Sequence, residues 1–384
     1  MNGERRTVKL LVQPGDSSGA LIKAIDGAKT SVEVLIFRLD RRDIEKALVK
    51  AAGRGVFVHA LIASTNRGGE QNLRDLETRL LDAGVTVART ADDLVRYHGK
   101  FIIIDRRVLF LLGFNFTHAD MEHSRSFGLM TSNAKLVQEA VRLFEADTKR
   151  QSYEAHNPAF LVSPVNARKQ ISEFLRGARK ELLIYDPRIS DPSIIRILDE
   201  RAKAGVDVRI LGHITRRSSR YQACPLAQTR LHTRTILRDR SRVFLGSQSL
   251  RALELDARRE VGAIFRDSRI CKTLANIFEE DWTAAAQARA SENEKAPATK
   301  VAKRVAKALA KEIPPVFPVV EGAVKELVGN HAEAEIELNA EELEATVKDA
   351  VKRAVKDAVR DVVQEAVEES VEEPAATARV EGGK

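Results

Sequence analysis

Apolar positions along the first three quarters of the chain follow two periods, and the periods recur in the same order. Short apolar or alternating runs have the length and pattern of strands, and between them lie stretches whose apolar side chains return at helical intervals. These segments are residues 34–36, 44–52 and 56–62, and again 182–184, 194–204 and 206–211. Strands that alternate with helices predict an α/β sandwich with a mixed sheet.

The recurrence is also visible in the residues themselves, which indicates an internal duplication. Residues 12–14, 27–29 and 55–56 correspond to residues 150 positions later. From His98 onward the offset becomes 134 and then stays constant. The corresponding pairs are His98 and His232, Lys100 and Arg234, Asp105 and Asp239, Asn115 and Ser249, Gly128 and Gly262, Phe144 and Phe278, Asp147 and Asp281. The offset changes because the stretch before His98, residues 62–97, is longer than the corresponding stretch before His232, residues 212–231.

The pattern divides the chain into two halves and a tail. We predict a first half at residues 1–155, a second at 156–289, and a linker with a charged helical tail at 290–384. Residues 341–373 contain neither Gly nor Pro, and valines recur there about every four positions. This spacing predicts an amphipathic helix, either solvated or able to bind another helix.

Charge and composition narrow the possible partners. The net charge is +8, yet residues 291–384 carry 14 Lys/Arg and 20 Asp/Glu by count along the sequence, so the body is strongly basic. A basic body favours polyanions such as nucleic acid or acidic lipid headgroups.

Two cysteines argue against a disulfide framework. The N-terminus resembles no signal peptide, and no apolar run is long enough to span a bilayer. We expect a cytoplasmic protein, with peripheral membrane contact as a further possibility.

The candidate chemistry lies in the segments that carry the paired histidines. His98 and Lys100 precede the apolar run 101–104, and on a strand residues two apart share a face. Asp105 ends that run, where it is better placed to brace the structure than to bind a substrate. Asn115 follows the next apolar run and could deliver an amide to the same cleft. The second copy presents His232, Arg234, Asp239, Ser247, Ser249 and Glu260.

These two motifs in register resemble the phospholipase D superfamily, whose signature is a duplicated His-x-Lys-x4-Asp with a downstream Gly-Ser-x-Asn. The resemblance covers residues 7 to about 285. It implies two pseudo-symmetric α/β/α sandwich halves with mixed sheets around one site. It also implies that one histidine attacks the phosphodiester phosphorus to form a phosphohistidine, while the other protonates the leaving group. His98 is the expected nucleophile and His232 the acid and base, although the reverse assignment is also compatible with the sequence.

The resemblance further implies that Lys100, Arg234 and Asn115 hold the phosphate oxygens, so that no metal or other cofactor is required. The chain departs from the pattern at four positions. Arg234 replaces Lys, Gly113 stands where Ser is expected, Ser249 stands where Asn is expected, and Ser126 occupies the register of Glu260. We therefore expect Glu260 to orient His232 and leave His98 without its usual carboxylate, unless Glu122 substitutes.

Two further groups of residues are weaker candidates for a site. His118 and His123 with Glu122 have the chemistry of metal ligands, but a polar turn is the more ordinary interpretation. Arg216, Arg217 and Arg220 precede the second motif and could meet a headgroup or a nucleic-acid backbone, or simply form a solvated loop.

Three functions remain open from the sequence. The first is a phospholipid phosphodiesterase or phosphatidyltransferase. The second is a metal-independent nuclease of the same superfamily, and the third is a degenerate module that binds phosphate or polyanions without catalysis.

Overall fold

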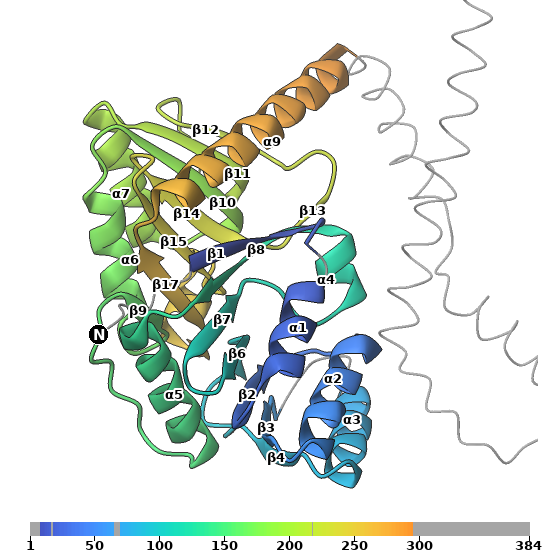
Figure 1. Cartoon of the computed structure of the whole chain (residues 1–384). Coiled ribbons are helices and arrows are strands. Elements are labelled where there is room, and N and C mark those ends of the chain that lie inside the picture. The colour runs from blue at the N-terminus through green and yellow to red at the C-terminus, as the bar shows by residue number, and fades with distance from the viewer. Residues whose placement is uncertain (1–7, 17, 65–69, 217, 295–384) are drawn as a thin grey trace, which may run out of the picture. The chain divides into compact units, whose positions relative to one another are not determined.

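The described part of the chain belongs mainly to one compact unit. The chain divides into Met1–Gln287 and Ala288–Lys384. The computed structural model describes residues 8–16, 18–64, 70–216 and 218–294 (Figure 1). The predicted tail helix lies outside these residues, and the three domain boundaries given above remain a proposal.

The first half is built on a mixed sheet in which the strands follow the order β1-β8-β7-β6-β2-β3-β4. Strands β2, β3 and β4 run parallel, and the other neighbours are antiparallel. The bounds are β1 Val8–Gln13, β2 Ser31–Ile36, β3 Phe57–Ile62, β4 Thr86–Arg89, β6 Phe101–Ile104, β7 Val108–Leu112 and β8 Ser124–Thr131.

The second half repeats this topology strand for strand. Its order is β12-β11-β10-β14-β15-β17-β9, with β10, β11 and β12 parallel and the remaining neighbours antiparallel. The bounds are β9 Phe160–Val162, β10 Glu181–Ile189, β11 Asp207–Ile214, β12 Gln222–Cys224, β14 Arg234–Arg238, β15 Arg242–Gly246 and β17 Val261–Phe265. The predicted pair of α/β halves with mixed sheets is confirmed.

Helices cover both sheets (Figure 1). The helix α7 begins at Pro192 because the Asp191 carboxylate accepts hydrogen bonds from the backbone of Ser193 and Ile194. No described helix is both long and apolar enough to cross a bilayer. The bounds are α1 Gly19–Gly27, α2 Arg42–Gly53, α3 Glu70–Asp82, α4 His118–Glu122, α5 Ala134–Thr148, α6 Ala167–Arg176, α7 Pro192–Lys203, α8 Ala252–Asp256 and α9 Ser268–Glu294.

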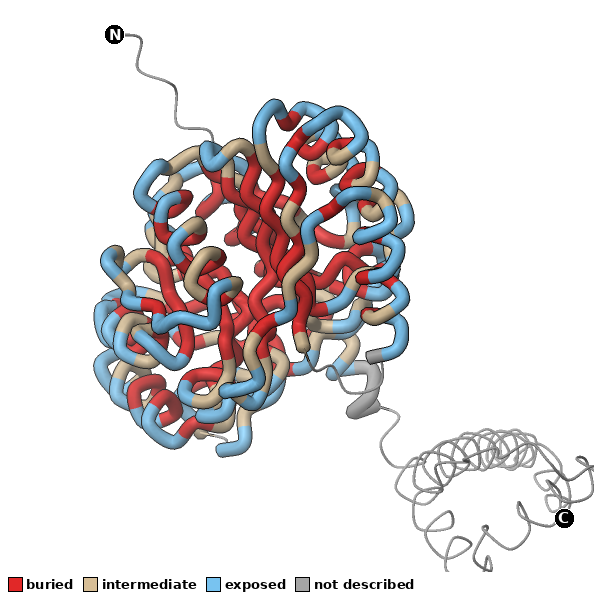
Figure 2. The backbone as a smooth tube through the Cα atoms, turned by 90° about the horizontal axis from the view of Figure 1, so that it is seen from below, coloured by how far each residue is buried: buried red, intermediate tan, exposed pale blue. Residues whose placement is uncertain are grey.

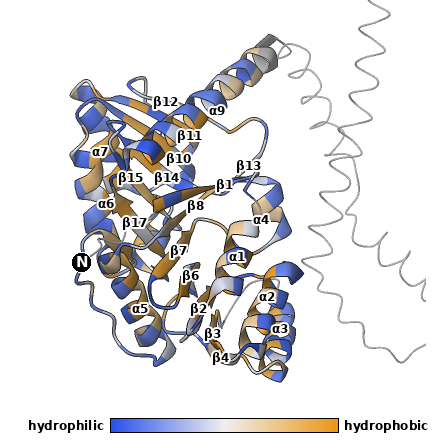
Figure 3. Cartoon of the chain, in the orientation of Figure 1, coloured by the Kyte–Doolittle hydropathy of each residue, from blue (hydrophilic) through white to orange (hydrophobic). Residues whose placement is uncertain are grey.

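The apolar core has three parts, and one of them joins the halves. Side chains of α1, α2 and α3 pack on one face of the first sheet, and those of α6 and α7 pack on one face of the second. The third cluster combines residues of both sheets with α5 and α9, which occupy equivalent places in the repeat. The buried segments at the centre of Figure 2 and the strongly apolar strands in Figure 3 are in keeping with this core. Both cysteines are free and buried.

The aspartate that ends each histidine motif braces its own half. The Asp105 carboxylate accepts hydrogen bonds from the backbone N–H groups of residues 29–31 at 2.7–3.0 Å. Asp239 does the same for residues 179–181 at 2.7–3.2 Å. Each carboxylate therefore fixes the entry to β2 or β10, beside the strand that follows the histidine.

Two short strand pairs link the halves reciprocally. Strand β5 (Arg96–Tyr97) of the first half pairs in parallel with β16 (Arg258–Arg259) of the second. Strand β13 (Arg230–Leu231) of the second half pairs in parallel with the start of β8 in the first. The repeat offset relates these two pairings to each other. Each half therefore inserts the segment just before its histidine into the other half.

A buried ion pair lies beside one of these links and predicts a pH-dependent stability. Asp147 of α5 lies 3.1 Å from the Arg259 guanidinium, and burial raises the Asp147 pKa to about 6 although Arg259 opposes the shift. A carboxyl whose pKa rises on folding stabilises the fold below its unfolded pKa, and this contribution is lost as pH rises through the folded value.

We expect the Asp147→Asn variant not to lose stability in this way as pH rises, because its side chain does not titrate. Between about pH 4 and about pH 7, the free energy of unfolding of the wild type should fall by about 2–3 kcal/mol relative to that of the variant. Urea denaturation across this range measures the difference. Parallel curves for the two proteins would show that Asp147 titrates as it does in the unfolded chain.

Candidate active site

The reciprocal strand pairs, β5 with β16 and β13 with β8, are a strand exchange between the halves that brings the two histidines to the same site. The His98 backbone N–H donates to the Arg259 carbonyl at 2.7 Å, and the His232 N–H donates to the Arg125 carbonyl at 3.1 Å. Both histidines precede a core strand, β6 or β14, rather than lying on it as the sequence pattern suggested. Gly99, between His98 and Lys100, passes so close to Val261 that a Cβ would lie 2.8 Å from its side chain.

His98 and His232 line the same cavity, which has a volume of about 650 Å³. Asn115 and Asp120 lie on one side of it, and several arginines reach it from both halves. Residues of α3 also line it. Helix α3 lies within residues 62–97, for which the second half has the shorter stretch 212–231. The arginine and α3 residues at this cavity are Arg38, Arg96 and Arg230, and Asn72, Leu73, Asp75 and Arg79.

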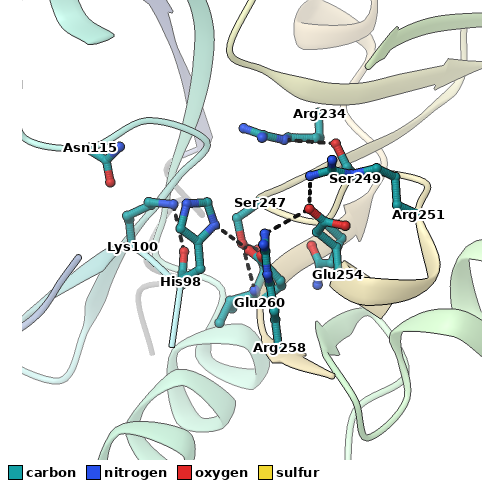
Figure 4. A network of polar contacts seen from close by, with 12 residues as sticks. His98, Lys100, Asn115, Arg234, Ser247, Ser249, Arg251, Glu254, Arg258 and Glu260 are labelled. Atoms are coloured by element: carbon teal, nitrogen blue, oxygen red, sulfur yellow. Dashed lines mark hydrogen bonds and ion pairs between the residues drawn. The ribbon is translucent and has the colours of Figure 1, made fainter. Parts of the chain in front are cut away.

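Glu260 orients His98, not His232. The His98 Nδ1 lies 2.8 Å from a Glu260 carboxylate oxygen, and both side chains are buried (Figure 4). The expectation that Glu260 serves the histidine of its own half was wrong, because the strand exchange carries His98 across to the second half. Glu122 does not substitute either: it pairs with Arg41 and His118 at the surface.

The carboxylate beside His232 is Asp120, which the sequence analysis did not identify. The His232 Nδ1 lies 3.3 Å from an Asp120 oxygen. That same oxygen accepts hydrogen bonds from the Asn115 backbone N–H at 2.8 Å and the Asn115 side-chain amide at 2.7 Å. Asn115 therefore holds Asp120 in place. Asp120 is in register with Glu254, not with Glu260, so the two histidines receive their carboxylates from non-equivalent positions of the repeat.

The two cations of the motifs are held in the same way. The Lys100 ammonium donates to the His98 carbonyl at 2.7 Å, and the Arg234 guanidinium donates to the His232 carbonyl at 2.8 Å. Both side chains are buried, with exposed fractions of 1% and 9%. In this respect Arg234 reproduces the position that Lys100 has in the intact motif.

Ser249 and Asp186 add a support that Lys100 lacks. The Arg234 Nε donates to the Ser249 hydroxyl at 3.3 Å, and Ser249 donates to the Asp186 carboxylate at 2.9 Å. Burial raises the Asp186 pKa to about 6. Ser247, by contrast, accepts from the Val261 backbone N–H at 3.0 Å and donates to the Val261 carbonyl at 3.4 Å. It also opposes the rise in the pKa of Glu260, the carboxylate that orients His98.

The electrostatic surroundings favour neutral imidazoles. Burial lowers the pKa of His98 well below its usual range, and Lys100 and Arg234 lower it further. Burial likewise lowers the His232 pKa, aided by Arg234 and Lys100. Burial raises the Glu260 pKa and lowers that of Lys100. A phosphate anion in the cavity would offset the repulsion between these cations.

The weaker candidates do not join this site. His118 and Glu122 lie on the short helix α4 rather than in the predicted turn. No group of three or more His, Cys, Asp or Glu side chains suited to a metal occurs among the residues that the structure describes. Arg216 and Arg220 lie between β11 and β12, and Arg217 lies outside the described residues.

Comparisons with known proteins identify the family of this chain. A family model described as cardiolipin synthase, PLD-like domain, matches residues 21–148 and 171–282. A mitochondrial cardiolipin hydrolase of Danio rerio is 27% identical over 134 residues, which cover 34% of this chain and 58% of that protein. The match thus spans little more than half the length of that relative.

Two solved structures have a similar fold. Polyphosphate kinase from Porphyromonas gingivalis aligns with a TM-score of 0.61 at 20% identity, over 71% of this chain and 50% of that one. Phosphatidylserine synthase from Haemophilus influenzae Rd KW20 aligns with a TM-score of 0.53 at 11% identity, over 72% and 85%. At these identities the likeness shows the fold alone. The family model, however, matches more than half of the chain, and the chain therefore belongs to the phospholipase D-like family.

Proposed function

We propose that this protein cleaves or exchanges phosphodiester bonds of phospholipids through a phosphohistidine intermediate. One observation supports the proposal above the others. The buried imidazole of His98 and that of His232, which is 12% exposed, line a single cavity, and a buried carboxylate from the opposite half lies beside the Nδ1 atom of each. This arrangement leaves Nε2 as the ring nitrogen for chemistry, and the nearby cations Lys100 and Arg234 suit a phosphate.

In the first step, the neutral His98 Nε2 attacks the phosphorus. The P–N bond forms as the bond to the leaving oxygen breaks, and that oxygen takes a proton from His232, which becomes protonated once the bound phosphate anion offsets the charges of Lys100 and Arg234. Glu260 stabilises the positive charge that develops on His98, and Asp120 stabilises the protonated form of His232. Lys100 and Arg234 neutralise the equatorial oxygens of the transition state.

In the second step, water or an alcohol displaces His98 from the phosphorus. His232 is now neutral and accepts the proton of the attacking hydroxyl, so that the P–N bond breaks and the enzyme returns to its starting state. The residues present can neutralise the phosphate without a metal ion. The reaction should therefore proceed in EDTA.

Phospholipid is the first substrate class because the Danio rerio relative is named a cardiolipin hydrolase. We extend the proposal to peripheral membrane contact, since such a substrate resides in a bilayer. A nuclease is the second candidate. Arginines around the cavity, including Arg38, Arg96 and Arg230, would also suit a nucleic-acid backbone.

Substrate assays on the full chain distinguish these functions. We expect release of product from vesicles of phosphatidylglycerol or cardiolipin in EDTA, and none from single-stranded or duplex DNA. Cleavage of DNA alone would replace the phospholipid proposal with the nuclease. If neither is cleaved, and His98→Asn binds both as the wild type does, the chain is a binding module.

Arg234→Lys should retain activity at a reduced level. Lysine can still donate to the His232 carbonyl, as Lys100 does to that of His98, but it loses the hydrogen bond to Ser249. We expect kcat/KM to fall about tenfold, the scale of one charge-assisted hydrogen bond. In the Arg234→Lys background, Ser249→Ala should lower kcat/KM little further, because the hydrogen bond that it would remove is already lost. Full additivity of the two changes would show that Ser249 acts independently of Arg234.

A further inference from the structure

A second basic cavity lies away from the active site, at the other end of β14. Arg234 begins this strand beside His232, and Arg238 ends it four residues later, roughly 13 Å along a strand. The cavity at Arg238 has a volume of about 360 Å³ and shares no lining residue with the active-site cavity. Its lining is Pro158, Ala159, Gln170, Glu173, Phe174, Arg238, Arg242, Ile264, Phe265 and Arg266.

The position of Arg238 is fixed by its surroundings. Its guanidinium lies 4.8 Å from the centroid of the Phe174 ring and donates to the Phe174 carbonyl at 2.8 Å. Gly177 allows this approach, because a Cβ there would lie 2.3 Å from a guanidinium nitrogen. The Nε atoms of Arg238 and Arg242 are buried and have no hydrogen-bond partner within the described part of the chain.

The positive charge here is poorly compensated. Across the described residues, no carboxylate lies within ion-pair distance of Arg238, Arg242 or Arg266, and Glu173 is the one acidic residue in the lining. Burial lowers the pKa of Arg238, and Arg242, Arg266 and Arg179 lower it further, whereas Asp239 raises it. Like charges gathered around a concave surface attract an anion.

The first half of the chain provides an internal control. In the repeat register, Arg238 corresponds to Ile104, Arg242 to Val108 and Arg266 to Ser132. The topology of the two sheets is the same, so the fold does not require arginine at these places. Arg240, by contrast, corresponds to Arg106, and both form ion pairs with glutamates. The three arginines of this cavity are therefore an addition of the second half.

A second cavity adjoins this one, and its lining is partly apolar, with Thr131, Asn133, Lys135 and Asn157 among the polar residues. It has a volume of about 270 Å³ and shares Ala159, Ile264, Phe265 and Arg266 with the basic cavity. Val8, Leu129 and Leu136 of the first half complete part of its wall. A ligand with a phosphate group and an apolar portion would meet both surfaces.

We propose that Arg238, Arg242 and Arg266 form a second anion site that binds a phosphate ester outside the active site. Guanidinium groups recognise phosphate oxygens through charge-assisted, often bidentate hydrogen bonds. The ester is either a soluble phosphate or the headgroup of a phosphate-bearing lipid. The proposal does not depend on the catalytic function, because none of its residues lies in the active-site cavity.

Calorimetric titration of the full chain with inorganic pyrophosphate tests the soluble form. In Arg242→Glu with Arg266→Glu, one class of binding site should weaken by about tenfold or more. Arg196→Glu is the matched control, because Arg196 is an exposed arginine on α7 of the same half. Arg242→Gln with Arg266→Gln should give a smaller loss in the same direction, and thermal unfolding checks that each variant is folded.

Flotation with phosphatidylcholine vesicles that contain phosphatidic acid tests the lipid form. Loss of vesicle binding alone in the double variant assigns the site to a lipid headgroup, and loss of pyrophosphate binding alone assigns it to a soluble ester. Either result supports the site. Unchanged binding of both probes in folded double variants, or an equal loss in Arg196→Glu, would overturn it.

Discussion

His98→Asn is expected to abolish turnover, with a fall in kcat of at least about a thousandfold. Asparagine keeps a polar side chain of similar reach but cannot attack phosphorus. The cations Lys100 and Arg234 and the cavity remain, so binding of a phosphodiester should change little. Rates of product release and the affinity for a non-hydrolysed substrate, measured on the same protein, separate the two effects.

His232→Asn is the informative comparison, because it tests which histidine is the nucleophile. With a natural phosphodiester it should be as inactive as His98→Asn. With a p-nitrophenyl phosphodiester, whose leaving group needs no proton, it should still release about one equivalent of p-nitrophenol. His59→Asn, at a half-buried histidine on β3, is the control. A burst in His98→Asn and none in His232→Asn would reverse the assignment.

Glu260→Gln should slow the reaction by about a hundredfold or more, the largest effect that we expect outside the two histidines. The glutamine has the same shape but no charge, so it cannot stabilise the positive charge that develops on His98 at 2.8 Å. Loss of the carboxylate also lowers the His98 pKa. Since His98 must be neutral to attack, the acidic limb of the pH–rate profile should move to lower pH.

Glu254→Gln is the matched control for Glu260→Gln. Glu254 is also a buried carboxylate of the second half, but it pairs with Arg251 and Arg258 (Figure 4). Among the ion pairs of the described residues, none joins Glu254 to a histidine. It should leave the acidic limb of the profile in place. An unmoved limb in Glu260→Gln, with a loss of rate no larger than in Glu254→Gln, would show that Glu260 has only a structural role.

The duplication and the α/β class with mixed sheets could be predicted from the sequence because both depend on local patterns. Apolar periodicity located β2, α2 and β3 and their counterparts β10, α7 and β11. The constant offset of 134 paired His98 with His232 and Lys100 with Arg234. The structure brings both histidines to one cavity, and Lys100 and Arg234 donate to their backbone carbonyls. The aspartates Asp105 and Asp239 could be placed at a strand end for the same reason.

The carboxylate partners could not be predicted, since they depend on contacts between the halves. Register alone assigns Glu260 to its own half, whereas the pairing of β5 with β16 carries His98 to Glu260. Asp120 lies on a five-residue helix with no motif around it. The available signal was its register with Glu254, an acidic residue at the same place in both copies. Two of the departures from the family pattern contact each other, since Arg234 donates a hydrogen bond to Ser249.

The central claim is that one imidazole becomes covalently bonded to phosphorus while the other half of the chain supplies its carboxylate. Rapid quenching of the enzyme with a substrate labelled at phosphorus, followed by peptide mapping under alkaline conditions, tests it most directly. We expect an acid-labile phosphoryl adduct on His98, absent from His98→Asn. Product formation with no adduct on either histidine would contradict the claim.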